Sequence, residues 1–317
     1  MAPQTIVLDA PEHNYSVDEM RRQYLKVDGN PPKPSEKTVY HYTSLDVLNE
    51  MCKETGDLLC THFMSLNDNQ EFFLGIDTVL EKLSSVFSSS ERKMQNLDLF
   101  QKNAPRMIVD HLRKESLVPW ITSFSADPDS LYQWVAYTDR KQGGVAIGFD
   151  LPTLQGKSKT VRSNPVLKGK ISCLPERCLY ADDAKISSHI RNAFSTAFSM
   201  LGNKRWPDKV RDMYLLAAVY VCASTIKNPS FSQEKEFRLI MIPTLKEVTR
   251  RYKFIGGKPR IATEFFGKNR ELAKAISSVV ISPHGDHAKL VSAVNLLRQQ
   301  HGLKFQIYKS RSSYNGR

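Results

Sequence analysis

Short hydrophobic runs and amphipathic stretches alternate along the chain, but without the regular strand-then-helix rhythm of a doubly wound sheet. Apolar or alternating runs predict strands at residues 38–43, 57–65, 120–125, 143–150, 235–243, 260–266, 276–282 and 304–310. Apolar residues at helical spacing predict helices at residues 44–54, 130–137 and 287–302, and further helices within 71–117 and 180–227. Strands interspersed with helices of unequal length predict an α+β fold.

The domain boundaries follow from breaks in this pattern. Residues 1–36 are predicted to be an N-terminal appendage and linker, because the proline-rich DGNPPKP precedes the first strand of the body. Residues 37–317 are predicted to form one domain, in which the helical stretches at about 72–117 and 180–228 are insertions.

The chain is strongly basic, since 45 Lys and Arg residues against 33 Asp and Glu give a net charge of +12. This balance favours a polyanionic partner such as nucleic acid. Basic residues gather in three acid-poor stretches, at 154–170, 246–260 and 301–317. We expect the first two to contact nucleic acid through Lys157, Lys159, Arg162, Arg250, Arg251 and Lys253. The alternative is that these charges are scattered over the surface and only solvated.

Nothing in the sequence predicts a membrane-bound or secreted protein. The longest apolar stretch, 213–223, is shorter than the ~18 residues that a membrane span needs. The first ten residues lack the pattern of a signal peptide. Five cysteines, without the spacing of a disulfide framework or a zinc site, predict free thiols in a reducing compartment. We therefore expect a cytoplasmic protein, and we predict no metal site.

Four stretches carry more hydrogen-bonding side chains than a purely structural element needs. They are residues 41–44 (HYTS), 65–71 (SLNDNQE), 125–137 (SADPDSLYQWVAY) and 234–238 (EKEFR). The first is unusual because His41 lies between two tyrosines in a run that should be a buried strand. Two interpretations stay open: a core histidine with satisfied hydrogen bonds, or a site that holds a polar ligand such as a nucleotide ribose.

The fourth stretch places two carboxylates at the start of a strongly apolar strand. In a strand, alternate side chains share a face, so Glu234 and Glu236 are predicted to point the same way, roughly 7 Å apart. Two like charges at that spacing are unfavourable unless a cation or a polar ligand uses them. The alternative is a solvated strand start with Lys235 and Arg238 as counter-ions.

Six motifs carry a resemblance to a known family. In chain order they are YHYTS, LNDNQEF, SFSADPDSLYQWVAY, GGVAIGFD, FSQEKEFR and SRSSY. Together they resemble a large bacterial family catalogued only as a domain of unknown function, over residues 38–314.

The order of elements also resembles the ADP-ribosyltransferase superfamily, which implies a split β-sheet core with helical insertions. In that superfamily a first-strand histidine bonds the ribose groups of NAD, and a late glutamate stabilises the oxocarbenium-like transition state. His41 matches the first position as a positioning donor, and Glu236 matches the last. Glu234 resembles a companion glutamate that orients the acceptor. The chain departs from the pattern after Gly56, where no G-x-Y-F sequence follows.

The second resemblance implies an NAD-dependent mono-ADP-ribosyltransferase. The residues expected to bind NAD are His41, Tyr42, Thr43, Ser65, Asn67, Trp134 and Tyr137. The basic charge favours nucleic acid as the acceptor, and a role as a toxin or phage-defence effector, with an antitoxin or chaperone as a possible partner. Two alternatives remain open. One is a non-catalytic nucleic-acid-binding module on the same fold, and the other is a nuclease with Asp68, Glu71 and Glu234 around Mg²⁺.

Overall fold

The computed structural model describes residues 25–35, 37–66, 70–114, 118–155, 170–172, 175–180, 183–202, 206–243, 253–255, 257–262 and 270–312. Its strands are β1 (Thr38–Thr43), β2 (Leu59–His62), β3 (Trp120–Ser125), β4 (Val145–Asp150), β5 (Lys170–Ser172), β6 (Glu176–Arg177), β7 (Leu179–Tyr180), β8 (Ile226–Lys227), β9 (Glu236–Pro243), β10 (Lys253–Ile255), β11 (Lys258–Ala262), β12 (Ile276–Ile281) and β13 (Gln306–Lys309). Its helices are α2 (Leu45–Cys52), α3 (Gln70–Val86), α4 (Ser89–Gln95), α5 (Leu97–Arg113), α6 (Leu131–Tyr137), α9 (Asp183–Leu201), α10 (Asp208–Ala223), α12 (Glu271–Lys274) and α13 (His287–Gln300), with 3-10 turns η1 (Phe63–Ser65) and η2 (Pro229–Glu234).

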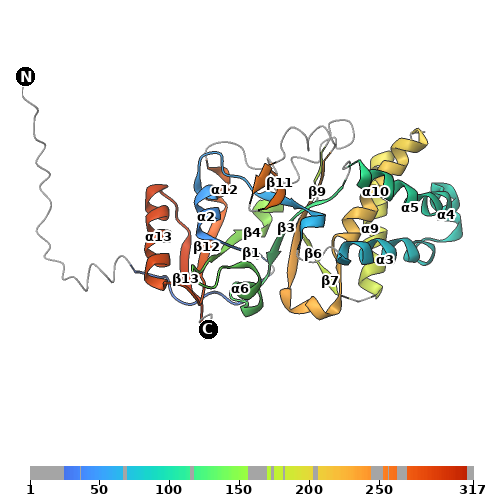
Figure 1. Cartoon of the computed structure of the whole chain (residues 1–317). Coiled ribbons are helices and arrows are strands. Elements are labelled where there is room, and N and C mark those ends of the chain that lie inside the picture. Colours follow the sequence, from blue (N-terminus) through green and yellow to red (C-terminus); the bar gives the residue numbers. More distant parts are fainter. Residues whose placement is uncertain are drawn as a thin grey trace, which may run out of the picture.

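The fold is α+β, as predicted, with a large mixed sheet between two groups of helices (Figure 1). Helices α2, α12 and α13 lie at one end of the molecule, and α3, α4, α5, α9 and α10 gather at the other. The sheet follows the order β10-β11-β2-β3-β1-β4-β12-β13, and β9 pairs with β3, β5 and β6. Its described pairs are antiparallel except β12 with β13, and the short strands β7 and β8 form a separate parallel pair.

The sheet divides at β3. Along one edge β3 pairs with β9 over its whole length, from Trp120 opposite Met241 to Ser125 opposite Glu236. Along the other edge it pairs with β2 at its beginning and with β1 only at Ser125. Residues 122–124 therefore have no strand partner on that edge in the described part of the chain. β1 and β2 diverge there, which leaves room for a cavity between them.

Two hydrophobic cores lie on opposite faces of the central strands. All eight residues of β9 are buried, because both faces of this strand are covered. Phe237, Leu239 and Met241 pack into the core with α2 and α13. Ile240 and Ile242 pack into the other core, with α3, α5, α9 and α10. Side chains two residues apart share a face, so Glu236 and Arg238 point toward the α3 side together with Ile240.

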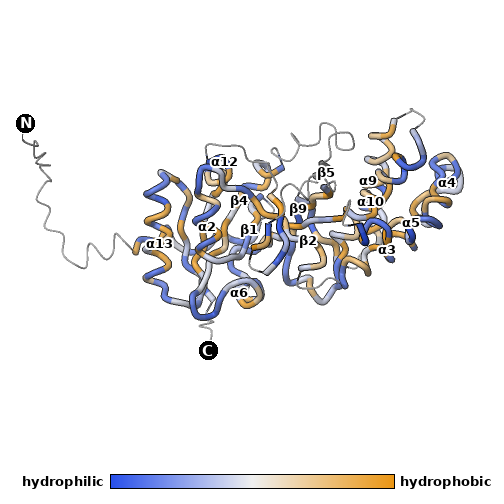
Figure 2. Tube along the Cα trace, turned by 45° about the horizontal axis from the view of Figure 1, so that its top comes forward, coloured by the Kyte–Doolittle hydropathy of each residue, from blue (hydrophilic) through white to orange (hydrophobic). Residues whose placement is uncertain are grey.

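The helices show the amphipathic patterns expected from the sequence. Figure 2 shows hydrophilic and hydrophobic residues alternating around α13, which packs Leu290, Val291 and Val294 into the core. Ser44 accepts a hydrogen bond from the backbone of Val47 at 3.4 Å and so begins α2. No helix among the described residues is long and apolar enough to cross a bilayer.

The predicted strand bounds differ from the structure mainly where a turn follows the strand. Strands 38–43 and 120–125 have the predicted bounds. The predicted strand 57–65 is shorter, because the backbone turns into η1 after His62. The predicted strand 260–266 begins earlier, at Lys258, and its last four residues lie outside the described part of the chain.

Candidate functional site

A cavity of about 530 Å³ lies where β1 and β2 diverge, and its size is within the range typical of small-molecule sites. β1, β2 and β3 contribute His41, Thr61 and Thr122 to its walls. The remaining walls come from α6, from β11, and from a group of charged residues on α3, β8, η2 and β9.

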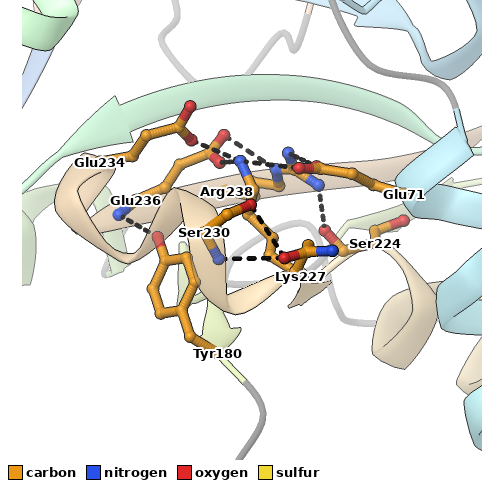
Figure 3. A network of polar contacts seen from close by, with 9 residues as sticks. Glu71, Tyr180, Ser224, Lys227, Ser230, Glu234, Glu236 and Arg238 are labelled. Carbon is orange, nitrogen blue, oxygen red and sulfur yellow. Dashed lines mark hydrogen bonds and ion pairs between the residues drawn. The ribbon is translucent and has the colours of Figure 1, made fainter.

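The charged residues form a buried network at one side of this cavity (Figure 3). The Lys227 ammonium donates to Glu236 at 2.7 Å and to Glu234, and it lies 3.4 Å from Glu71. The Arg238 guanidinium donates to Glu236 at 2.8 Å and to Glu71 at 3.0 Å. The five side chains are only 3–7% exposed, so their mutual attraction is weakly screened by water. We call these five residues the acidic cluster, because three carboxylates face two cations.

Neighbouring backbone groups hold the acidic cluster in place. Arg238 also donates to the carbonyl of Ser224 at 2.8 Å, at the end of α10. The backbone N–H of Glu236 donates to the Tyr180 hydroxyl at 2.9 Å. The Ser125 hydroxyl donates to the carbonyl of Glu234 at 2.7 Å. Buried charges are stable only when they are paired and hydrogen-bonded in this way.

The structure corrects the prediction that Glu234 and Glu236 share a strand face by alternation. Glu234 ends the 3-10 turn η2, and Lys235 has φ 46° and ψ 46°, in the left-handed region. This turn brings the Glu234 carboxylate to the same ammonium that Glu236 contacts. Lys235 is not a counter-ion of either glutamate, since it pairs with Asp127 at 3.0 Å. Arg238 does pair with Glu236, as the alternative interpretation expected, but the pair is buried rather than solvated.

The two glutamates differ in their pKa values. Burial would raise the pKa of Glu236, but the charges of Arg238 and Lys227 outweigh this and lower it to about 2. Burial and the neighbouring charge of Glu236 raise the pKa of Glu234 above its ordinary value, although Lys227 opposes the shift. With all three carboxylates ionised, three negative charges and two positive charges give the acidic cluster a net charge of −1. Protonation of Glu234 makes the cluster neutral.

His41 also lines the cavity, from β1. Its Nδ1 is 2.9 Å from the carbonyl oxygen of Ser123, on the edge of β3 that lacks a strand partner. A carbonyl only accepts, so Nδ1 carries the proton of this hydrogen bond. Burial, helped by the charge of Arg260, lowers the pKa of His41 and favours the neutral ring. In the neutral ring Nε2 is an acceptor, whereas the resemblance implied a donor at this position.

The helix α6 forms a third wall through Tyr132 and Tyr137. Asp129 fixes this helix, because its carboxylate accepts from Trp134 Nε1 at 2.9 Å and from the backbone of Arg311 at 2.7 Å. Burial and the charges of Glu236 and Glu234 raise the pKa of Tyr137, so its hydroxyl keeps its proton. The C-terminal SRSSY motif therefore connects to the α6 motif through Asp129.

Tyr42 and Trp134 occupy structural positions within this arrangement. Trp134 has no exposed surface, and its ring packs edge-on against Tyr42 with centroids 4.6 Å apart. The Tyr42 hydroxyl donates to the carbonyl of Asp127 at 2.7 Å and accepts from the backbone of Ser130 at 2.8 Å. Although Tyr42 lines the cavity, its hydroxyl is already occupied by these two bonds.

The other predicted site residues lie in different places. Thr43 and Tyr137 line the cavity, whereas Ser65 is half-buried in η1 and is not part of the lining. Lys253 is exposed on β10. Six predicted residues fall outside the described part of the chain: Asn67, Lys157, Lys159, Arg162, Arg250 and Arg251. Asp68 also lies outside it.

In the described part of the chain, no three His, Cys, Asp or Glu side chains are grouped so that they could hold a metal ion. Glu71 and Glu234, which the nuclease alternative placed around Mg²⁺, both contact the Lys227 ammonium.

Sequence reasoning missed three cations that line the cavity, Lys227, Lys258 and Arg260. Lys227 follows a hydrophobic helix, and nothing in the local pattern shows that it is buried. Lys258 and Arg260 lie on the short strand β11, between β10 and β2, within a basic stretch that the sequence assigned only to nucleic acid. The sequence contained one signal for Lys227. Two glutamates two positions apart need a counter-charge, and Lys227 lies seven residues before Glu234 and nine before Glu236.

Comparison with protein families gives one match. Residues 133–239 match the family described as Protein of unknown function (DUF2971). This DUF2971 domain is consistent with the expected resemblance to a family of unknown function, over about a third of the chain rather than residues 38–314. The domain contains Lys227, Glu234, Glu236 and Arg238, whereas Glu71 and His41 lie outside the match. No curated protein and no solved structure matches the chain.

Proposed function

We propose that the cavity binds NAD and that the protein is a mono-ADP-ribosyltransferase. The observation that carries this proposal is the meeting of His41 and the acidic cluster around one cavity at the split in the sheet. His41 and Glu236 are 195 positions apart in the chain, and β3 connects them, since it contacts β1 at one edge and β9 at the other. β1 and β2 pair with opposite ends of the same edge of β3 and diverge between them. This division of the sheet supports the proposal, because ADP-ribosyltransferases have a split β-sheet core.

The charge of the acidic cluster suits the chemistry of NAD cleavage. When the bond between C1′ of the ribose and the nicotinamide nitrogen breaks, the electron pair leaves with nicotinamide, and positive charge develops on the ribose. A fixed negative charge beside that carbon stabilises the transition state more than the ground state. Glycosidases use carboxylates against the same kind of cation. The acceptor atom then bonds to C1′ and loses its proton.

Within the cluster, the two glutamates have different parts in the proposal. Glu236 is ionised but held by both Lys227 and Arg238, so it fixes the geometry and supplies a permanent charge. Glu234 contacts only Lys227 among the cations of the cluster, whereas Glu71 and Glu236 each contact both Lys227 and Arg238. We therefore assign the unshared negative charge to Glu234, whereas the resemblance assigned the transition-state charge to Glu236.

The Nε2 acceptor of His41 suits a ribose hydroxyl, and the tyrosines of α6 give the nicotinamide ring an aromatic wall. A nucleic-acid acceptor remains our proposal because of the net charge of +12. A cytoplasmic role as a toxin or defence effector belongs to the same proposal.

The test is the release of nicotinamide from NAD by the purified protein, alone and with total RNA, DNA or protein as acceptor. We expect Glu234→Gln to fold normally and to cut turnover by about 10²-fold, the scale of losing one preorganised electrostatic partner. Glu50→Gln, which removes an exposed carboxylate from α2, is the matched control and should keep wild-type turnover. Wild-type turnover by Glu234→Gln, or no NAD cleavage under any condition, would contradict the proposal. Activity that EDTA abolishes and Mg²⁺ restores would favour the nuclease alternative.

A further inference from the structure

The wall formed by β11 carries two cations, and one of them, Arg260, forms no ion pair within the described part of the chain. Lys258 and Arg260 both line the cavity, and they lie two residues apart on one strand face. Ile261, between them and the end of the strand, points the other way and has no exposed surface in the sheet core. The strand therefore has one apolar face in the core and one basic face toward the cavity.

Pairing with the neighbouring strand extends this basic face. Arg260 is directly opposite Lys253 on β10, and residues opposite each other in an antiparallel pair point to the same face. On its other side, Arg260 is opposite Thr61 of β2, which also lines the cavity. The hairpin from 253 to 262 contains three cations and no acidic residue. We call these three side chains, Lys253, Lys258 and Arg260, the basic wall.

Arg260 has a buried side-chain donor without a partner. Its Nε is buried and has no hydrogen-bond partner, and it forms no ion pair within the described part of the chain. The carboxylates of the acidic cluster do not reach it, because they bond to Lys227 and Arg238. Burying a guanidinium donor without a partner costs free energy, and a bound anion offsets that cost. The planar fork of an arginine suits phosphate oxygens in particular.

We propose that the basic wall binds the phosphate groups of the ligand, with Arg260 and Lys258 as the contacts inside the cavity. The cavity then has two unlike sides, a net negative one at the acidic cluster and a positive one at β11. A ligand with a cationic ring at one end and a diphosphate farther along, as in NAD, matches both sides. This inference deepens the proposed function, but phosphate binding by Arg260 is measurable without any cleavage of NAD.

The two possible sources of phosphate are the diphosphate of a dinucleotide and the backbone of a nucleic acid. Lys253 is exposed and lies farther along the same face, so it contacts a nucleic-acid strand more readily than a small ligand inside the cavity. The two sources therefore predict different effects of Lys253→Gln: little effect on ADP-ribose binding, but weaker binding of a single-stranded oligonucleotide.

Calorimetric titration of the full-length protein with inorganic pyrophosphate tests the inference directly. We expect binding that weakens as salt is added and that falls at least ~10-fold in Arg260→Gln and in Lys258→Gln. Lys289→Gln removes the same charge from a side chain that is 86% exposed on α13, and it should bind like the wild type. Because the Arg260 side chain makes no hydrogen bond or ion pair with the described part of the chain, ligand-free Arg260→Gln should melt no lower than the wild type.

The outcomes separate this inference from the proposed function. No pyrophosphate binding by the wild type, or equal binding by Arg260→Gln, would overturn the basic wall. A loss of binding in Arg260→Gln that is accompanied by a lower melting temperature and is absent in Lys258→Gln would overturn it too. If pyrophosphate competes with ADP-ribose, the basic wall binds the diphosphate of NAD, the donor of the ADP-ribosyl group. If it competes with a single-stranded RNA oligonucleotide, the basic wall binds the nucleic acid that accepts this group. Pyrophosphate binding without NAD cleavage leaves the basic wall standing and removes ADP-ribosyl transfer.

Discussion

Replacing Lys227 with methionine removes the cation that contacts all three carboxylates of the acidic cluster. Lys227 bonds to Glu236 at 2.7 Å and to Glu234, and it lies 3.4 Å from Glu71. Without it, three carboxylates face only the Arg238 guanidinium, and the net charge of the cluster changes from −1 to −2. Methionine keeps most of the length and apolar volume of the lysine side chain, so the change is mainly electrostatic.

The expected cost follows from the burial of these groups. Removing one partner of a buried ion pair typically lowers the free energy of unfolding by about 3–5 kcal/mol, because the other charge is left uncompensated. Part of the cost is relieved when Glu234 takes up a proton, since its pKa is already raised. At about 2–4 °C per kcal/mol for a domain of this size, the melting temperature should fall by on the order of 10 °C.

The matched control is Lys235→Met. Lys235 pairs with Asp127 at 3.0 Å, but its side chain is 45% exposed, so its loss should change the free energy of unfolding by less than about 1 kcal/mol. A second variant tests whether the loss comes from charge. Glu234→Gln, introduced into Lys227→Met, removes one of the uncompensated carboxylates. The free energy of unfolding of the double variant should exceed the value expected from adding the two single changes by about 1–3 kcal/mol. Urea denaturation followed by circular dichroism measures five proteins: the wild type, Lys227→Met, Glu234→Gln, the double variant and the Lys235→Met control.

Two results would refute this account of the cluster. One is a Lys227→Met protein as stable as the Lys235→Met control. The other is strict additivity of the Lys227 and Glu234 changes, which would mean that the two side chains do not interact in solution.

Three further predictions concern the cavity. His41→Ala should raise the KM for NAD and lower kcat with little change in melting temperature, whereas a core histidine would give a less stable protein with normal activity per folded molecule. The rate of NAD cleavage should fall as the pH drops through the pKa of Glu234, which is raised above 4.5. The reason is that protonation of Glu234 removes the net negative charge of the acidic cluster. A rate that does not change with pH across that range would contradict this. The low pKa of Glu236, about 2, stabilises the folded state at pH values above 4.5, and this contribution of about 3 kcal/mol is lost as the pH falls toward 2. The stability difference between wild type and Glu236→Gln should therefore shrink over that acid range in denaturation experiments, and a constant difference would show that the pair does not form.

The strands and helices of this protein were largely predictable because their patterns are local. β1 and β3 have the bounds that the sequence predicts, since apolar and polar residues alternate over a few positions. The helix α6 was predictable from its first residues, because Ser130 accepts from the backbone of Gln133 and begins the helix. The polar stretches around His41 and Glu236 were also visible, because so many hydrogen-bonding side chains are unusual in buried strands.

Only the tertiary structure decided how these polar side chains combine. Arg238 and Glu71 form an ion pair across 167 positions of the chain, and no periodicity reports such a contact. Lys227 and Arg260 look like ordinary surface cations in the sequence, because burial depends on which strands become neighbours and which helices cover them. The left-handed backbone of Lys235 sets the direction of Glu234, and the strand alternation read from the sequence missed that turn. The sequence by itself determined where strands, helices and polar stretches lie, while the division of the sheet at β3 decided which of them share a cavity and with what charge.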